Sequence, residues 1–113
     1  MREPHDKPIL MHMLEDIQDI LQFTDGLDIV AFKNNTLVKK AVCMSLLNIG
    51  ELAKELPISL TIQYPLIPWK NIIGLRNRTA HGYHFLDDSI VREISIKDIP
   101  SLNAAVEDAL AKI

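Results

Sequence analysis

The residues with the clearest chemical potential fall in one short segment, from Gly74 to Tyr83. This segment combines two arginines with an asparagine, a histidine and a tyrosine, namely Arg76, Asn77, Arg78, His81 and Tyr83. In a helix, Asn77 and His81 share a face because they are four residues apart, whereas Arg76 and His81 diverge by about 140°. Two chains that meet along this helix could bring both Arg–His pairs into one cleft.

Side chains of these types could cleave a phosphodiester bond. A histidine can take up or release a proton near neutrality, since the pKa of a free imidazole side chain is ~6.5. A guanidinium can bind a phosphate through two hydrogen bonds and stabilise the charge that develops on it. RNA supplies its own nucleophile, the 2′-hydroxyl, so this reaction needs no metal. The alternative is an exposed helix end whose polar side chains only cap the helix and contact water.

Hydrophobic periodicity predicts the helices that position this segment. Apolar residues recur every three or four positions within 10–21, and the run Thr-Asp-Gly at 24–26 then favours a helix end. The longest helix is predicted from about 37 to 56, with Thr36 as its N-cap and Pro57 after its end. Met44 and Leu47 lie off the main apolar stripe of this helix. It therefore lies at the centre of a bundle or faces another subunit.

Two further helices and a final amphipathic stretch are expected at 68–81, at about 88–96 and at 102–110. Gly82 should end the first of them, Asp87 or Asp88 should cap the second, and Pro100 should break or restart it. No segment shows the strict alternation of a β-strand. The pattern predicts an all-α bundle of four to five helices.

Composition narrows the class of protein. The chain has 113 residues, of which 48% are hydrophobic, so we expect one ordered domain, residues 1–113. Cys43 is the only cysteine, which excludes a disulfide-stapled scaffold and fits a reducing cytoplasm. No apolar run is long enough to span a membrane. We expect no metal and no cofactor, because His5 and His12 are scattered and Cys43 has no Cys or His at ligand spacing.

Charge is unevenly distributed, although the net charge is only −3. Residues 29–86 hold seven basic and two acidic residues, whereas the remaining segments hold five basic and thirteen acidic residues. This asymmetry could mark a polyanion site, or it could disperse on folding, because charge segregation along a sequence need not survive folding. Arg78, His84 and Lys70 are the candidates for contact with RNA.

Several other polar or aromatic residues allow two interpretations. Trp69 could stack on a base or pack in the first turn of a core helix. Lys39 and Lys40 could line an RNA path or contact water. Asn48 and Glu51 could support the site or a polar dimer contact, or could be core residues with local hydrogen bonds.

Residues 76–83 read Arg-x4-His-x-Tyr with an asparagine after the arginine, and this run resembles the motif of the HEPN ribonuclease toxins. The similarity is to the HepT branch, from the HepT/MntA toxin–antitoxin systems. Residues 48–54 resemble the central-helix segment of that family, and residues 64–69 resemble the Tyr-Pro…Ile-Pro-Trp run that leads into its motif helix. Asp87 and residues 98–102 match downstream landmarks.

The resemblance implies an antiparallel helical bundle and a homodimer with a composite cleft that cleaves RNA without a metal. By position, Arg76 and His81 would be the catalytic pair, with Asn77 supporting it. Tyr83 would be the residue to which a partner nucleotidyltransferase, the MntA-like antitoxin, adds AMP. One departure is Arg92, which stands where the family often has an aromatic residue and affects packing more than catalysis.

A function of a different class is the alternative that the sequence leaves open. The chain could be a non-catalytic helical module that binds a nucleotidyltransferase or a nucleotide. Its motif would then serve as a phosphate-binding surface.

Overall fold

The computed structural model describes residues 6–80 and 87–113, and for residues 76–80 it describes the backbone alone. These ranges form six helices, namely α1 (Asp6–Thr24), α2 (Ile29–Lys33), α3 (Thr36–Lys54), α4 (Ile58–Thr61), α5 (Trp69–Ala80) and α6 (Asp88–Ala111). The expected all-α class is confirmed for this part of the chain. The count exceeds the predicted four to five because the connections include two short helices, α2 and α4. None of the described helices is long and apolar enough to cross a membrane.

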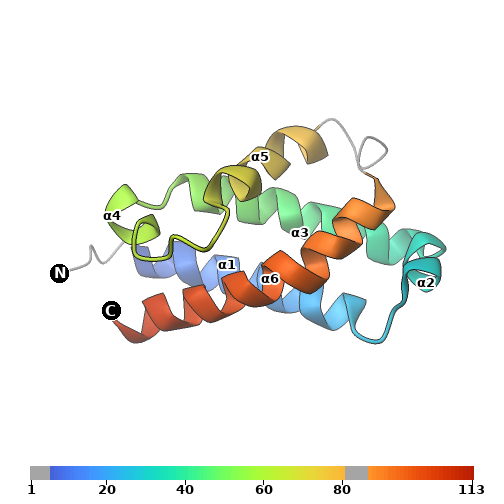
Figure 1. The fold of residues 1–113 in the computed structure, drawn as a ribbon, viewed down its shortest axis with the longest axis horizontal. Helices are drawn as coiled ribbons and strands as arrows, with labels where there is room; N and C mark the ends of the chain where they lie inside the picture. The colour runs from blue at the N-terminus through green and yellow to red at the C-terminus, as the bar shows by residue number, and fades with distance from the viewer. Residues whose placement is uncertain (1–5, 81–86) are drawn as a thin grey trace.

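Three long helices, α1, α3 and α6, form the body of the molecule (Figure 1). α1 packs against both α3 and α6 and runs antiparallel to each of them. α5 lies along α3 in the opposite direction, and this pair makes the most extensive helix contact. The helix that carries Arg76 and Asn77 is therefore held mainly by α3.

The core lies where the apolar stripes of the three long helices meet. Its most deeply buried members are at most 1% exposed and include Leu10, Met13, Ile17 and Ile20 of α1, Val42, Leu46 and Ile49 of α3, and Ile99, Leu102 and Val106 of α6. Burial of each large apolar side chain stabilises the fold by roughly 1.5–3 kcal/mol. The predicted stripes of these helices are thus the surfaces that join them.

α3 begins one residue earlier than expected and uses a different cap. The Asn35 side chain accepts a hydrogen bond from the backbone N–H of Val38 at 3.0 Å, so Asn35 is the N-cap and Thr36 is the first helical residue. The expectation of Thr36 as the cap is wrong. Both residue types cap helices well, and the chain uses the asparagine.

α6 continues through Pro100, so the expected break at this residue is wrong. Proline lacks the N–H that would bond to the carbonyl of Ile96. Pro100 and Ile96 are both exposed, which allows water to solvate that carbonyl. Buried Ile99 and Leu102 flank the proline on the core side, and their packing holds both halves of the helix in line.

Arg92 of α6 has a structural role. Its Nε and one terminal nitrogen donate hydrogen bonds to the carbonyl oxygen of Leu27, at 3.3 Å and 3.2 Å. Leu27 lies in the connection between α1 and α2. The side chain that stands in place of the family's aromatic residue therefore fixes this connection to α6.

Candidate active site

The last turns of α5 carry the first half of the predicted catalytic segment. Arg76, Asn77 and Arg78 lie in this helix, where the backbone is described and the side chains are not. His81, Tyr83 and His84 lie outside the described residues. The assigned roles of all six residues stay predictions.

A small hydrogen-bonded cluster fixes the start of α5. The indole N–H of Trp69 donates to the carbonyl oxygens of Thr61 and Tyr64, both at 3.1 Å. The Tyr64 hydroxyl donates to the Asp108 carboxylate at 2.7 Å, and this carboxylate also pairs with Lys112 at 2.8 Å. Trp69 is partly buried against the core, so it packs in the first turn of α5, one of the two roles considered for it. The cluster connects the chain before α5 to the end of α6.

One face of α5 holds the helix on the core. Ile72 and Leu75 are buried and lie three residues apart on that face. Lys70 and Asn71 are exposed, and Gly74 is partly exposed. The helix therefore presents a polar side, with one position that lacks a side chain, next to its buried side.

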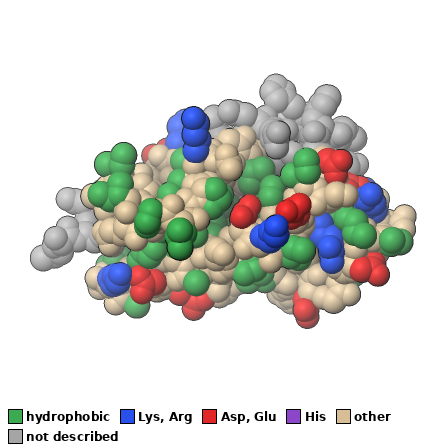
Figure 2. Space-filling model, viewed as in Figure 1, with side chains coloured by type: hydrophobic (Ala, Val, Ile, Leu, Met, Phe, Trp, Pro, Cys, Tyr) green, Lys and Arg blue, Asp and Glu red, His purple; other side chains and the backbone are tan. Residues whose placement is uncertain are grey.

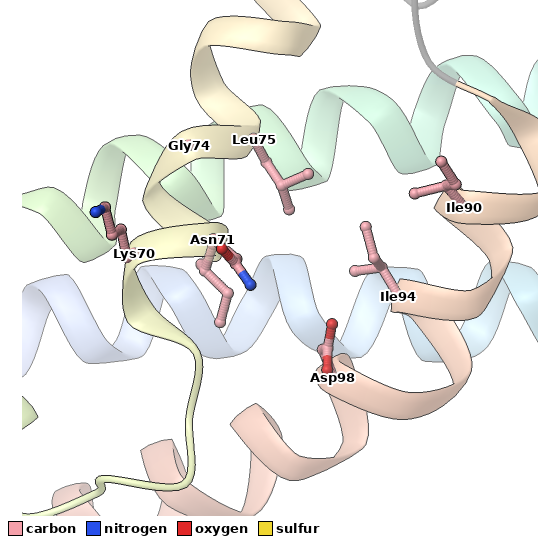
Figure 3. Close-up of a pocket in the computed structure, with 8 residues that line it drawn as sticks. Lys70, Asn71, Gly74, Leu75, Ile90, Ile94 and Asp98 are labelled. Carbon is pink, nitrogen blue, oxygen red and sulfur yellow. The ribbon is translucent and has the colours of Figure 1, made fainter.

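This polar side of α5 borders a cleft of about 510 Å³, whose other wall is α6 (Figure 3). The lining residues are Lys70, Asn71, Ile72, Gly74 and Leu75 of α5 and Ile90, Ile94 and Asp98 of α6. Its volume falls within the ~300–1,000 Å³ of ligand pockets. Of the predicted RNA contacts, Lys70 lines the cleft. Sequence reasoning assigned no role to Asn71 and noted Asp98 only as part of the 98–102 landmark.

An ion pair fixes the start of α6 to α3. The Lys39 ammonium lies 3.3 Å from the Asp88 carboxylate, and both side chains are largely covered, at 17% and 30% exposed. Lys39 is therefore not a purely solvated residue. Cys43, one turn further along α3, is buried; burial and the nearby Asp88 carboxylate raise the pKa of its thiol to about 11.

Asn48 bridges α3 to α1. Its side chain is hydrogen-bonded to Asp16, whose pKa is raised mainly by burial and lowered in part by this bond. Asn48 is exposed, and its bond runs between two helices, so the expectation of a core residue with a local hydrogen bond is wrong for it.

Charges of both signs mix on the surface around these elements. On the face shown in Figure 2, acidic and basic side chains lie interspersed over α6. The basic middle of the sequence does not form a separate basic face in this view. Among the described residues, no group of three or more His, Cys, Asp or Glu side chains is placed to hold a metal ion.

The chain matches the family model described as "Ribonuclease HepT-like" over residues 13–109. It therefore belongs to the HepT-like ribonuclease family, within the HEPN group. The resemblance seen in the sequence is confirmed at this level.

Several archaeal and bacterial proteins are similar along nearly their whole length. "Putative RNase MJ1380" of Methanocaldococcus jannaschii is 33% identical over 101 residues, which cover 89% of this chain and 93% of that protein. "Putative RNase TTE0752" of Caldanaerobacter subterraneus is 30% identical, over 94% of this chain and 95% of that protein. "Probable ribonuclease HepT" of Thermococcus cleftensis is 30% identical, over 95% of this chain and 96% of that protein. No solved structure gave a significant match.

Proposed function

We propose that this chain is the toxin of a toxin–antitoxin pair and cleaves RNA without a metal ion. Membership of the HepT-like ribonuclease family supports a ribonuclease. The observation that carries the proposal is the complete Arg-x4-His-x-Tyr run at residues 76–83 of such a chain. The helical backbone of α5 over residues 76–80 agrees with a motif built on a rigid element.

In the proposed reaction, the 2′-oxygen of a ribose attacks the adjacent phosphorus and the bond to the 5′-oxygen breaks. His81 moves a proton to or from these oxygens. Arg76 stabilises the negative charge that develops on the phosphorus oxygens, and Asn77 supports the pair. The products carry a 2′,3′-cyclic phosphate, or a 3′-phosphate after hydrolysis, and a 5′-hydroxyl.

The test compares two histidine variants on total RNA in EDTA. We expect the parent protein to cut in EDTA and His81→Ala to lose ~10²–10⁴-fold in rate, as is typical for a lost acid–base group. His12→Ala is the matched control, because His12 lies on α1 with its side chain 65% exposed, and it should cut normally. Cleavage of a 2′-deoxy substrate, or a strict need for metal, would contradict the mechanism.

We further propose that a partner nucleotidyltransferase silences the toxin by adding AMP to Tyr83. The added phosphodiester would pair with the arginines of the motif and compete with the RNA phosphate. After co-expression, mass spectrometry should locate AMP on the peptide that contains Tyr83. Tyr83→Phe should stop growth even when the partner is present. If the partner neutralises Tyr83→Phe as well as the parent, it acts by binding alone.

A further inference from the structure

The cleft between α5 and α6 contains a carboxylate that no described side chain neutralises. Asp98 lines the cleft, and among the described residues it has no hydrogen bond or ion pair. Lys70 lines the same cleft, but its side chain points away from Asp98 (Figure 3). An unpaired carboxylate repels a phosphate. This part of the cleft therefore favours an occupant that brings hydrogen-bond donors.

The remaining walls suit a flat, weakly polar group. Leu75, Ile90 and Ile94 turn their side chains into the space between the two helices (Figure 3). Gly74 leaves the α5 wall open, since a Cβ added there would meet nothing within 4 Å. Flipped or unpaired bases are commonly held between apolar side chains and recognised along their Watson–Crick edge.

Two polar side chains of the cleft, one neutral and one charged, match one base in particular. Asn71 and Asp98 extend toward the same space from opposite helices (Figure 3). On its Watson–Crick edge, guanine presents the O6 acceptor beside two adjacent donors, N1–H and the N2 amino group. A carboxylate can accept from both donors while an amide N–H donates to O6. Adenine, cytosine and uracil each present a single donor group on this edge.

We propose that this cleft is a guanine-binding subsite of the ribonuclease. Asp98 accepts from N1–H and N2, Asn71 donates to O6, and the apolar side chains cover the base. Lys70, at the outer end, contacts a phosphate of the same strand. The subsite rests on the proposed ribonuclease function. Gly74 precedes Arg76 by only two residues on α5, so a base bound in the cleft would lie close to the proposed catalytic residue. The ribonuclease would therefore prefer to cleave near a guanosine.

The sharpest probe is inosine, which keeps O6 and N1–H but lacks the N2 amino group. Short RNAs with one guanosine, one inosine or one adenosine near a single cleavage site would be compared. The parent should cleave the guanosine RNA about 10- to 100-fold faster than the inosine RNA, the range expected for one bidentate base contact. Asp98→Asn should reduce this ratio to a few-fold at most, because an amide cannot accept from both donors.

Two further variants separate the subsite from general effects on folding. Asp19→Asn makes the same change of charge on exposed α1 surface outside the cleft and should keep the full guanosine preference. Gly74→Ala places a methyl group in the cleft without a clash in the fold. It should lower the preference for guanosine at unchanged or raised melting temperature, since alanine favours helix.

Binding measured without cleavage distinguishes failure of the subsite from failure of the proposed function. Titration of the parent and of His81→Ala with GMP, IMP and AMP should show GMP bound at least about 10-fold more tightly. Equal binding of GMP and IMP would overturn the subsite, even if the protein cleaves RNA. Selective GMP binding by a protein that cuts no RNA would uphold the base site and overturn the ribonuclease.

Discussion

Among the described residues, Cys43 is the one whose chemistry the fold changes most clearly. Burial, followed by the Asp88 carboxylate, raises the pKa of its thiol from 9.0 to about 11, and Lys39 opposes this only in part. The folded state therefore keeps its proton where the unfolded chain has lost it. Between these two pKa values the folded protein binds more protons, so its stability falls as pH rises through this interval.

The same shift predicts slow modification of Cys43. Thiolate is the reactive form, and at pH 8 a shift of the pKa from 9.0 to about 11 lowers the thiolate fraction about 100-fold. Reaction with a disulfide reagent should thus be slow in native buffer and fast in denaturant. Its rate in the native state should keep rising up to about pH 11. A rate that levels off near pH 9 would contradict the buried environment.

The motif residues could be identified from the sequence, but the cleft could not. The types of Arg76, Asn77 and His81 allowed RNA cleavage or a capped helix end, and their resemblance to a family motif favoured cleavage, in agreement with the family that the comparisons identify. The cleft could not be predicted, because Asn71 and Asp98 are distant in sequence and line one cleft only once the fold places α5 and α6 on either side of it. Charge counts along the chain gave no sign of an unpaired carboxylate there.

At the scale of elements, the Asp87 side chain caps the N-terminus of α6. The Asp87 carboxylate accepts from the N–H groups of Ser89 and Ile90, at 2.7 Å and 3.3 Å. Asp87→Ala should lower the free energy of unfolding by about 1 kcal/mol, and Asp87→Asn by less, since asparagine also caps well. Urea unfolding measures both. Asp25→Ala, an exposed change outside any helix, should stay within about 0.5 kcal/mol of the parent.

Helices were predictable in type and apolar face but less so at their ends. The apolar stripes of α1 and α3 were evident from residue spacing, because burial imposes that spacing. Asn35 and Thr36 are adjacent and both suited to capping, so local sequence did not decide between them. At Pro100, packing of the neighbouring residues outweighed the local preference to end a helix.

At the scale of the whole molecule, two large apolar side chains of α3 are exposed on its outer face, beside the exposed polar residues Lys40 and Asn48. Leu37 and Met44 are 80% and 57% exposed, and they lie seven residues apart on one side of this helix. We expect this face to join two chains in a homodimer with two-fold symmetry. Light scattering at micromolar concentration should give about twice the chain mass of 12.8 kDa.

A pair of arginine substitutions tests the position of this interface. Met44→Arg places a charge in the proposed contact and should give a 12.8 kDa monomer. Leu66→Arg is the control, because Leu66 is 95% exposed in the connection between α4 and α5, and it should leave the dimer intact. A parent protein that is monomeric yet cleaves RNA would exclude a shared cleft.

The direction of the helices has a practical consequence. α1 begins and α6 ends at the end of the bundle near α4, whereas α5 ends and α6 begins toward the other end (Figure 1). The molecule is elongated, with extents of 46 × 27 × 22 Å. A linker attached at Ile113 would therefore anchor the chain to a solid support with the end of α5 facing the solution. A biosensor surface prepared in this way would keep that end accessible to dissolved nucleotides.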